Sequence, residues 1–275
     1  MEALSSAETS LHCAFFELDL PSLQQLLRDR ALTQDVRVVM DDGYLKDFNE
    51  SFVRADRWGL MHNKFCVIDQ KEVITGSTNP TENGVNKNDN NLVRIFSHLV
   101  VQNYEDEFQE LWNGTFKGGE KVKSPRIHLS NSSLETYFCP EDQCAEHLKD
   151  ELEKAQEHIF FLTFSFTHAG IADILLLKHL DGVPIEGVME ASQVSKYSQY
   201  QRLRHNQIAV RKDTNPSMMH HKVFIIDGKT VVTGSFNPTE NGDKRNDENM
   251  LVIHDPLLAQ HFQEEFHRIW ETAVP

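Results

Sequence analysis

The sequence is short of cysteine and of long apolar runs, and each shortage excludes a class of protein. Four cysteines among 275 residues are too few for a disulfide scaffold. No apolar run reaches the ~18–20 residues that span a bilayer. The densest stretch, 159–166, is interrupted by Thr163 and Ser165 and predicts a buried strand. Residues 1–10 have neither the basic start nor the apolar centre of a signal peptide.

Basic residues are also in deficit. There are 27 Lys and Arg against 42 Asp and Glu, which gives a formal net charge of −15. Such a charge argues against a surface that binds nucleic acid over its whole area, so a polyanion would need a local basic patch. An apolar content of 39% and a charged content of 25% are typical of a globular chain with a substantial core.

The cysteines carry little further information. Cys13 and Cys66 lie in apolar, strand-like runs and are predicted to be buried thiols. Cys139 and Cys144 flank a Pro-Glu-Asp helix start, where a local disulfide is an option, but two unpaired thiols are favoured. A structural zinc would need two further ligands that the sequence does not offer beside them. We therefore expect no metal and no cofactor, and the cellular compartment stays open.

An internal repeat is the strongest feature that is present. Residues 79–84 read Asn-Pro-Thr-Glu-Asn-Gly, and residues 237–242 repeat them 158 positions later. The same offset holds without a gap over a long stretch, which chance does not produce. It relates His62 to His220, Lys64 to Lys222, Asp69 to Asp227, Gly76 to Gly234, Ser77 to Ser235, Tyr104 to Phe262, Phe108 to Phe266 and Trp112 to Trp270. We predict a first repeat at 1–116, a linker at 117–135 and a second repeat at 136–275.

Each repeat has the pattern of an α/β unit. In the second, we predict helices at 141–157, 169–180 and 256–271, with strands at 158–166, 184–189, 220–227, 229–234 and 249–254. In the first, we predict strands at 11–17, 35–40, 61–69, 72–76 and 91–96, with helices at 21–29 and 98–112. Only about eight residues precede the first strand of the first repeat, whereas a whole helix precedes that of the second. The start therefore looks trimmed, which leaves room for a removed leader or anchor.

Both repeats carry His-x-Lys-x4-Asp followed by Gly-Ser-x-Asn. Because side chains alternate along a strand, the histidine and lysine of each motif share one face. Asp69 and Asp227 lie an odd number of steps from the histidines, so we interpret them as structural. The motif residues are His62, Lys64, Asp69, Ser77 and Asn79 in the first repeat, and His220, Lys222, Asp227, Ser235 and Asn237 in the second.

A histidine with a nearby lysine, present twice, suits phosphodiester cleavage. One neutral imidazole can attack phosphorus and form a phosphohistidine, while the other protonates the departing oxygen and then activates water. The two lysines and the Asn and Ser side chains would neutralise and hydrogen-bond the phosphate oxygens. The lysines supply the positive charge, so no metal is required. Both motifs lie in one chain, so we expect a monomer without an obligate protein partner.

The motif pair, together with Gly-Ser-Phe-Asn at 234–237 and Asn-Asp-Glu-Asn at 246–249, resembles the phospholipase D superfamily. The resemblance covers nearly the whole chain, and the second half is especially similar to the small bacterial endonucleases of that family. It implies two pseudo-twofold-related α/β repeats, each a mixed β-sheet flanked by helices, with one active site at the interface between repeats. It also implies the phosphohistidine route described above.

Several neighbouring residues are better explained by structure than by chemistry. His221 adjoins His220 on a strand and should face the opposite way, so it is given no function. Glu82 and Glu240 also repeat, but Pro-Thr-Glu-Asn-Gly is typical of a turn and a helix cap.

Two rival interpretations were weighed. A metal-dependent phosphodiesterase is disfavoured because each lysine would repel the cation and no carboxylate-rich cluster accompanies either motif. A catalytically impaired scaffold that binds phosphodiesters is disfavoured because both histidines and both lysines are present.

The substrate is less strongly indicated, and a nuclease acting on DNA or RNA is the first expectation. Lys87, Lys244 and Arg245 follow the Gly-Ser-x-Asn segments and are predicted to bind substrate together with Ser77 and Ser235. A basic run of Arg202, Arg204, Arg211 and Lys212 could follow a phosphate backbone. The chain also lacks an obvious apolar insertion for acyl chains. Hydrolysis or transfer of phospholipid headgroups is the alternative.

The two repeats differ at one position that bears on mechanism. Glu248 lies 28 residues after His220, and Asn90 lies 28 residues after His62. In the family, an acidic residue here holds the imidazole, so Asn90 is a departure. We predict that Glu248 pairs with His220 and keeps it protonated as the general acid, which leaves His62 as the nucleophile. Asp89 adjoins Asn90 and is a possible substitute.

Overall fold

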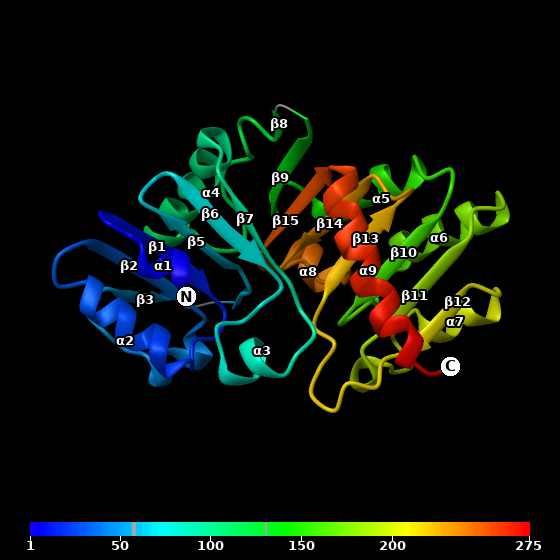
Figure 1. The fold of residues 1–275 in the computed structure, drawn as a ribbon, viewed down its shortest axis with the longest axis horizontal. Helices are drawn as coiled ribbons and strands as arrows, with labels where there is room; N and C mark the ends of the chain where they lie inside the picture. The colour runs from blue at the N-terminus through cyan, green and yellow to red at the C-terminus, as the bar shows by residue number, and fades with distance from the viewer. Residues whose placement is uncertain (57–58, 130) are drawn as a thin grey trace.

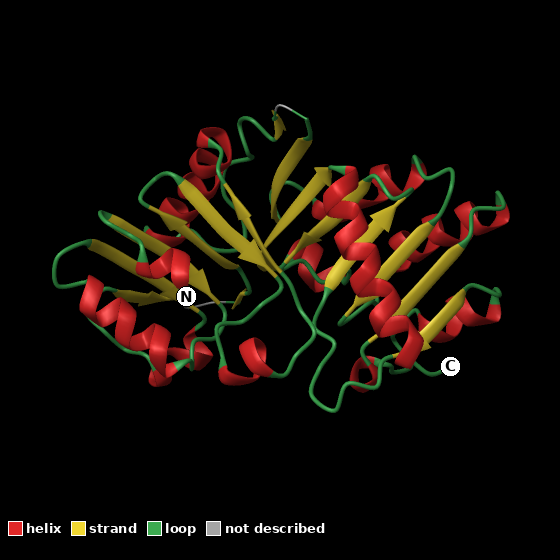
Figure 2. Ribbon diagram, in the orientation of Figure 1, coloured by secondary structure: helices red, strands yellow, loops and turns green. Residues whose placement is uncertain are grey.

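The computed structural model describes residues 1–56, 59–129 and 131–275, and it contains two mixed β-sheets flanked by helices (Figures 1 and 2). The first sheet has the order β3-β2-β1-β5-β6-β7. Its parallel strands are β1 (Ser10–Phe15), β2 (Asp35–Met40) and β3 (Val53–Ala55), and its antiparallel strands are β5 (Lys64–Ile68), β6 (Glu72–Gly76) and β7 (Leu92–Ile95). The predicted fold class is confirmed.

The second sheet repeats this order and extends it. It runs β12-β11-β10-β13-β14-β15-β9-β8, and β4 (Leu60–Met61) of the first repeat pairs with β15. The other strands are β8 (Arg126–His128), β9 (Ser133–Cys139), β10 (Ile159–Thr163), β11 (Ile185–Met189), β12 (Ala209–Lys212), β13 (Lys222–Ile226), β14 (Thr230–Gly234) and β15 (Asn246–His254). The hairpin β8–β9 begins inside 117–135, the segment interpreted as a linker that could hold a short hairpin, and it adds two strands to the second sheet.

Helices cover both faces of each sheet. In the first repeat these are α1 (Glu2–Ser5), α2 (Pro21–Arg30), α3 (Glu82–Asn86) and α4 (His98–Trp112), with a 3-10 helix η1 (Asp42–Asp47). In the second they are α5 (Cys144–Glu153), α6 (Ala169–Leu180), α7 (Tyr200–His205), α8 (Glu240–Lys244) and α9 (Pro256–Thr272), with η2 (Ala191–Gln193). The bounds of β2, β6, α4 and α6 are those predicted from the sequence.

The core joins the two repeats. Helix α4 carries an apolar stripe at three- and four-residue spacing, and its Tyr104 and Phe108 are fully buried. They belong to one cluster with Phe138 and Leu251 of the second sheet. Burying such a side chain stabilises a fold by about 1.5–3 kcal/mol. The interface that carries the motifs is therefore held by a shared apolar core.

The prediction of free thiols was wrong. Cys13 and Cys66 form a disulfide, because they face each other directly across the antiparallel strands β1 and β5. Cys139 and Cys144 form the local disulfide that had been the less favoured option. In the described ranges, no helix has the length and apolar character needed to cross a membrane.

Candidate active site

The two motifs meet at a pseudo-twofold junction between the sheets. The backbone N–H of His62 donates to Asp247 O at 2.9 Å, and that of His220 donates to Asp89 O at 2.7 Å. Met61 is aligned with Asp247, and Met219 with Asp89, each in a parallel pairing. Each histidine is thus fixed at the backbone by the other repeat.

The side-chain partners of the two histidines differ. The Nδ1 of His62 lies 2.7 Å from Glu248 Oε2, and that of His220 lies 2.9 Å from the backbone oxygen of Ser77. Both imidazoles are 6% exposed and Glu248 is fully buried. A proton on Nδ1 satisfies both acceptors, so each ring presents the lone pair of Nε2.

The predicted pairing of Glu248 with His220 was therefore wrong. The carboxylate crosses the interface and binds His62, because β15 runs beside β4 of the first repeat. Sequence distance within one repeat could not reveal this exchange of partners. The asymmetry predicted from Asn90 persists, but with the carboxylate on the other histidine.

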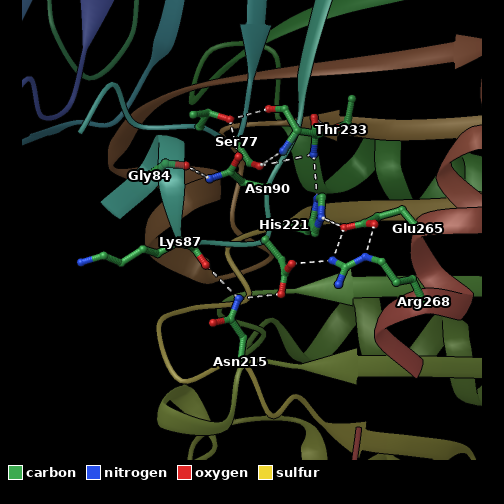
Figure 3. A network of polar contacts seen from close by, with 12 residues as sticks. Ser77, Gly84, Lys87, Asn90, Asn215, His221, Thr233, Glu265 and Arg268 are labelled. Carbon is green, nitrogen blue, oxygen red and sulfur yellow. Dashed lines mark hydrogen bonds and ion pairs between the residues drawn. The ribbon is translucent and has the colours of Figure 1, made fainter. Parts of the chain in front are cut away.

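The side chains of Asn90 and Asp89 both bind residues other than the motif histidines (Figure 3). Asn90 accepts a hydrogen bond from the Thr78 hydroxyl and donates to Gly84 O, both at 2.7 Å. The Asp89 carboxylate binds Arg268 and accepts from the Asn215 side-chain amide. Neither side chain pairs with a motif histidine, so Asp89 does not substitute for the missing acid.

The two motif lysines have equivalent hydrogen-bond partners and equivalent ring contacts. Lys64 Nζ donates to His62 O at 2.7 Å, and Lys222 Nζ donates to His220 O at 2.9 Å. Each ammonium also faces an aromatic ring, that of Phe16 at 5.2 Å or that of Phe164 at 4.9 Å from the centroid. These rings were not predicted from the sequence, since they recur at an offset of 148 and not 158.

Burial and repulsion between neighbouring cations shift the pKa values of the motif residues. Burial lowers the pKa of both His62 and His220 well below the ordinary value, and the two lysines add to the shift. Burial also lowers the pKa of Lys64 to about 7 and lowers that of Lys222 strongly. It raises the pKa of Glu248 to about 7. The site thus favours neutral imidazoles, and a bound phosphodiester anion would restore charge to the cations.

The glycines of Gly-Ser-x-Asn permit a close backbone approach. Gly76 has φ 152° and Gly234 has φ 140°. A Cβ on either would lie 2.3 Å from the backbone oxygen of Asn91 or Asn249. Those same oxygens accept from the amides of Ser77 and Ser235 at 3.1 and 3.0 Å. Any side chain at the glycines would separate the two segments.

Ser77 and Ser235 do not have the predicted exposure to substrate. Both are fully buried. The Ser77 hydroxyl accepts from the backbone amide of Asn91, and the Ser235 hydroxyl donates to Glu248 Oε2 at 2.7 Å. Their hydroxyls hold neighbouring residues of the site in place, because the turn after each glycine directs both serine side chains into the interior.

Asn79 and Asn237 are half-buried, and each has a buried Oδ1 without a hydrogen-bond partner in the described part of the chain. They stay candidates for phosphate binding.

The predicted cations beyond the motifs fall into two groups. Lys87 and Arg245 are exposed at equivalent positions, the ends of α3 and α8. Lys244 forms an ion pair with Glu240 of its own helix.

The predicted basic run does not form a free patch. Arg202 pairs with Asp173, and the guanidinium of Arg211 lies 4.0 Å from the centroid of the Trp270 ring. Arg204 and Lys212 both face the Tyr200 ring. These residues lie on α7 and β12, at the edge of the second sheet (Figure 1). Intramolecular partners thus occupy the run that had been expected to follow nucleic acid.

Asp69 and Asp227 hold the start of the central strands. Asp69 accepts from the backbone amides of residues 8–10, and Asp227 from those of residues 156–158. Although burial alone raises it, these donors lower the pKa of Asp69 to about 2 and also lower that of Asp227.

His221 is 1% exposed and faces away from the site. It lies between the Asn91 side-chain amide at 3.0 Å and Glu265 at 3.2 Å (Figure 3). The structure thus places it as the sequence predicted.

Comparison with known proteins places these features in a family. The sequence profile described as "Cardiolipin synthase, PLD-like domain" matches residues 1–112 and 148–270. A phospholipase D of Rickettsia prowazekii is 35% identical over 139 residues, covering 50% of this chain and 68% of that protein. A mitochondrial cardiolipin hydrolase of Chlamydomonas reinhardtii is 35% identical over 123 residues, covering 44% of this chain and 55% of that protein.

Two solved structures show the same arrangement. Nuc, a phospholipase D family member from Salmonella typhimurium, is 29% identical with a TM-score of 0.50, covering 52% of this chain and 96% of its own. A phosphatidylserine synthase from Haemophilus influenzae is 14% identical with a TM-score of 0.75, covering 99% of this chain and 83% of its own. The first matches about half of this chain, and the second shares the fold of nearly all of it.

Proposed function

Since the chain belongs to the phospholipase D superfamily, we propose that it hydrolyses phosphodiesters through a phosphohistidine on His62. The bound phosphodiester anion favours a second proton on His220, at Nε2. The Nε2 lone pair of His62 attacks phosphorus, and the bond to the leaving oxygen breaks as that oxygen takes this proton from His220. Water then gives a proton to His220 and attacks phosphorus, which breaks the N–P bond and frees neutral His62.

The observation that carries this assignment is the buried contact between Glu248 and His62. Attack makes the nucleophilic ring cationic, and a carboxylate at Nδ1 stabilises that charge. Among the described residues, the Nδ1 of His220 has a neutral carbonyl as its hydrogen-bond partner, so His220 holds its proton less strongly and releases it more readily. The bound anion keeps the lysines protonated, and the lysines stabilise the negative charge that forms on the phosphoryl oxygens. The reaction therefore needs no metal.

For the substrate class, the proposal is an amphiphilic phosphodiester such as a phospholipid. Lys64 is among the residues that line a cavity of about 160 Å³, and the wall of this cavity is largely apolar. The wall includes Leu4, Leu20, Leu23, Val85 and Leu92, and of these Val85 and Leu92 are exposed. Such a cavity beside the phosphate-binding lysine suits an apolar group attached to the diester.

A nuclease is the second candidate. The exposed cations Lys87 and Arg245 occupy equivalent positions after the two motifs, where a single strand could contact both.

Assays in EDTA with phosphatidyl vesicles, single-stranded DNA and a small p-nitrophenyl diester test both the mechanism and the substrate. We expect turnover to survive EDTA. Leu92→Asp should reduce lipid turnover and spare the small diester, whereas Lys87→Glu with Arg245→Glu should leave lipid turnover near wild type.

Loss of turnover in EDTA that a divalent ion restores would overturn the mechanism. Activity on DNA alone, lost in the double charge reversal, would assign the nuclease function instead.

A further inference from the structure

Three aspartates of the first repeat lie close together at the ends of two neighbouring strands. Asp41 and Asp42 follow β2, and Asp56 follows β3. One oxygen from each carboxylate lies within 4.8 Å of the others. Asp41 and Asp56 are 5% and 1% exposed, while Asp42 is exposed to solvent. No carboxylate cluster near a motif was predicted from the sequence, because the three residues come together only when β2 and β3 pair.

Each buried aspartate uses only one oxygen. Asp41 Oδ1 accepts from the Gly43 amide at 3.0 Å, and Asp56 Oδ1 accepts from the Asp42 amide at 2.7 Å. Both Oδ2 atoms are buried without a hydrogen-bond partner in the described residues. The Met61 amide lies close enough to lower the pKa of both groups, but without hydrogen-bond geometry to either Oδ2. Two buried acceptors are therefore left open, which is costly unless a proton or a cation occupies them.

At the equivalent position of the second repeat, every carboxylate oxygen has a hydrogen-bond donor. Glu190 and Asp213 take the positions of Asp41 and Asp56, and four backbone amides at 2.8–3.0 Å saturate their four oxygens. One of these donors is the Met219 amide, the counterpart of Met61. Ala191 stands where the first repeat has Asp42. The first repeat alone thus combines a third carboxylate with two open oxygens.

Another acidic cluster of the molecule lacks these properties. Glu135, Glu151 and His254 also lie within 4.8 Å of one another. Arg126 forms an ion pair with Glu135, and Lys154 forms one with Glu151. Protein cations already neutralise that cluster, so a metal ion would gain little there.

We propose that Asp41, Asp42 and Asp56 form a binding site for Ca²⁺. Carboxylate oxygens are the ligands that hard divalent cations prefer, and opposite ligands of Ca²⁺ lie about 4.8 Å apart because its bonds to oxygen are about 2.4 Å long. Asp42 and Asp56 also line a cavity of about 900 Å³, from which water can complete the coordination. The ion joins the ends of β2 and β3.

The site is structural and separate from the proposed chemistry. Lys64 lies within electrostatic range of Asp41 and opposes the cation. We therefore expect a dissociation constant of about 10⁻⁵–10⁻³ M, weaker than that of dedicated calcium buffers.

The test uses the full chain stripped with EDTA and titrated with Ca²⁺ and with Tb³⁺. Thermal unfolding and tyrosine-sensitised Tb³⁺ luminescence are the two measurements, since Tyr44 of η1 donates its backbone amide to Asp41 O at 3.1 Å. We expect Ca²⁺ to raise Tm, because a ligand that binds only the folded chain stabilises it. Asp42→Asn, an exposed change that preserves the fold, should weaken binding about tenfold or more. Asp29→Asn, which removes an exposed carboxylate on α2, is the matched control and should bind as wild type does.

Absence of any Tm shift and of Tb³⁺ luminescence in the wild-type chain would overturn the proposal, and so would equal affinities of Asp42→Asn and Asp29→Asn. Tighter binding of Mg²⁺ than of Ca²⁺ would overturn the choice of ion. Because binding and not turnover is measured, failure here leaves the catalytic proposal untouched.

Discussion

The two repeats share a motif and a fold but surround their histidines differently. His62 is held by a buried carboxylate from the other repeat, and His220 by a backbone carbonyl. The counterparts Glu107 and Glu265 also diverge: burial raises the pKa of Glu107 well above normal, whereas Glu265 is paired with Arg268 and His221, and its pKa falls to about 2 against the effect of burial. Duplication thus supplies two similar imidazoles. Divergence of the residues around them can then give one imidazole the role of nucleophile and the other that of general acid.

The largest expected effect tests what the repeats have in common. Lys64→Met and Lys222→Met should each lower kcat by about 10²–10³, because each ammonium opposes charge that forms on the phosphoryl oxygens. Steady-state kinetics on a p-nitrophenyl diester would measure this. Lys229→Met, at an exposed lysine paired with Glu157, is the control and should leave kcat unchanged. A change confined to KM would show that the lysines only bind substrate.

The next effect separates the repeats. Glu248→Gln should lower kcat by about 10–10³, since an amide cannot stabilise cationic phosphohistidine and can impose the wrong tautomer on His62. Asn90→Asp should leave kcat near wild type, because Asn90 bonds within its own repeat and not to a histidine. Equal losses in the two variants would mean that the carboxylate position has the same role in both repeats.

The pH dependence sharpens the same comparison. With a p-nitrophenyl diester, whose leaving group needs no proton from His220, catalysis needs an ionised Glu248 and a charged Lys64, and each has a pKa of about 7 in the free site. We therefore expect kcat/KM to be highest near pH 7, to fall as pH rises and Lys64 loses its proton, and to fall as pH drops and Glu248 gains one. The alkaline limb of kcat should lie at higher pH, because bound phosphate stabilises the ammonium. An alkaline limb unchanged between kcat/KM and kcat would contradict this coupling.

The smallest expected effect concerns the structural aspartates. Asp69→Asn and Asp227→Asn should each cost about 1–3 kcal/mol of unfolding free energy, since backbone amides lose a charged acceptor. The folded pKa of Asp69 is depressed to about 2, so its contribution is present above the unfolded value near 3.8 and is lost as pH falls through 2. Urea unfolding at neutral and acid pH would measure both. Full stability in either variant would remove that aspartate from this role.

Much of this molecule could be predicted from its sequence because local signals agree. The 158-residue offset located both motifs, and apolar periodicity gave the bounds of α4 and α6. What could not be predicted depends on pairing between distant segments. The disulfide of Cys13 and Cys66 requires the register of β1 and β5, and the contact of Glu248 with His62 requires β15 to lie beside β4. Ser77 and Ser235 likewise turn inward only once the glycine turns are folded.

The most direct test of the central claim is to trap the covalent intermediate. A p-nitrophenyl diester has a leaving group that needs no protonation, so the first step does not depend on the general acid. The account predicts that His220→Ala accumulates a phosphoenzyme on His62, detected by intact mass and located by peptide mapping, while His62→Ala forms none. A phosphoenzyme on His220 in the His62→Ala variant, with none in His220→Ala, would contradict it.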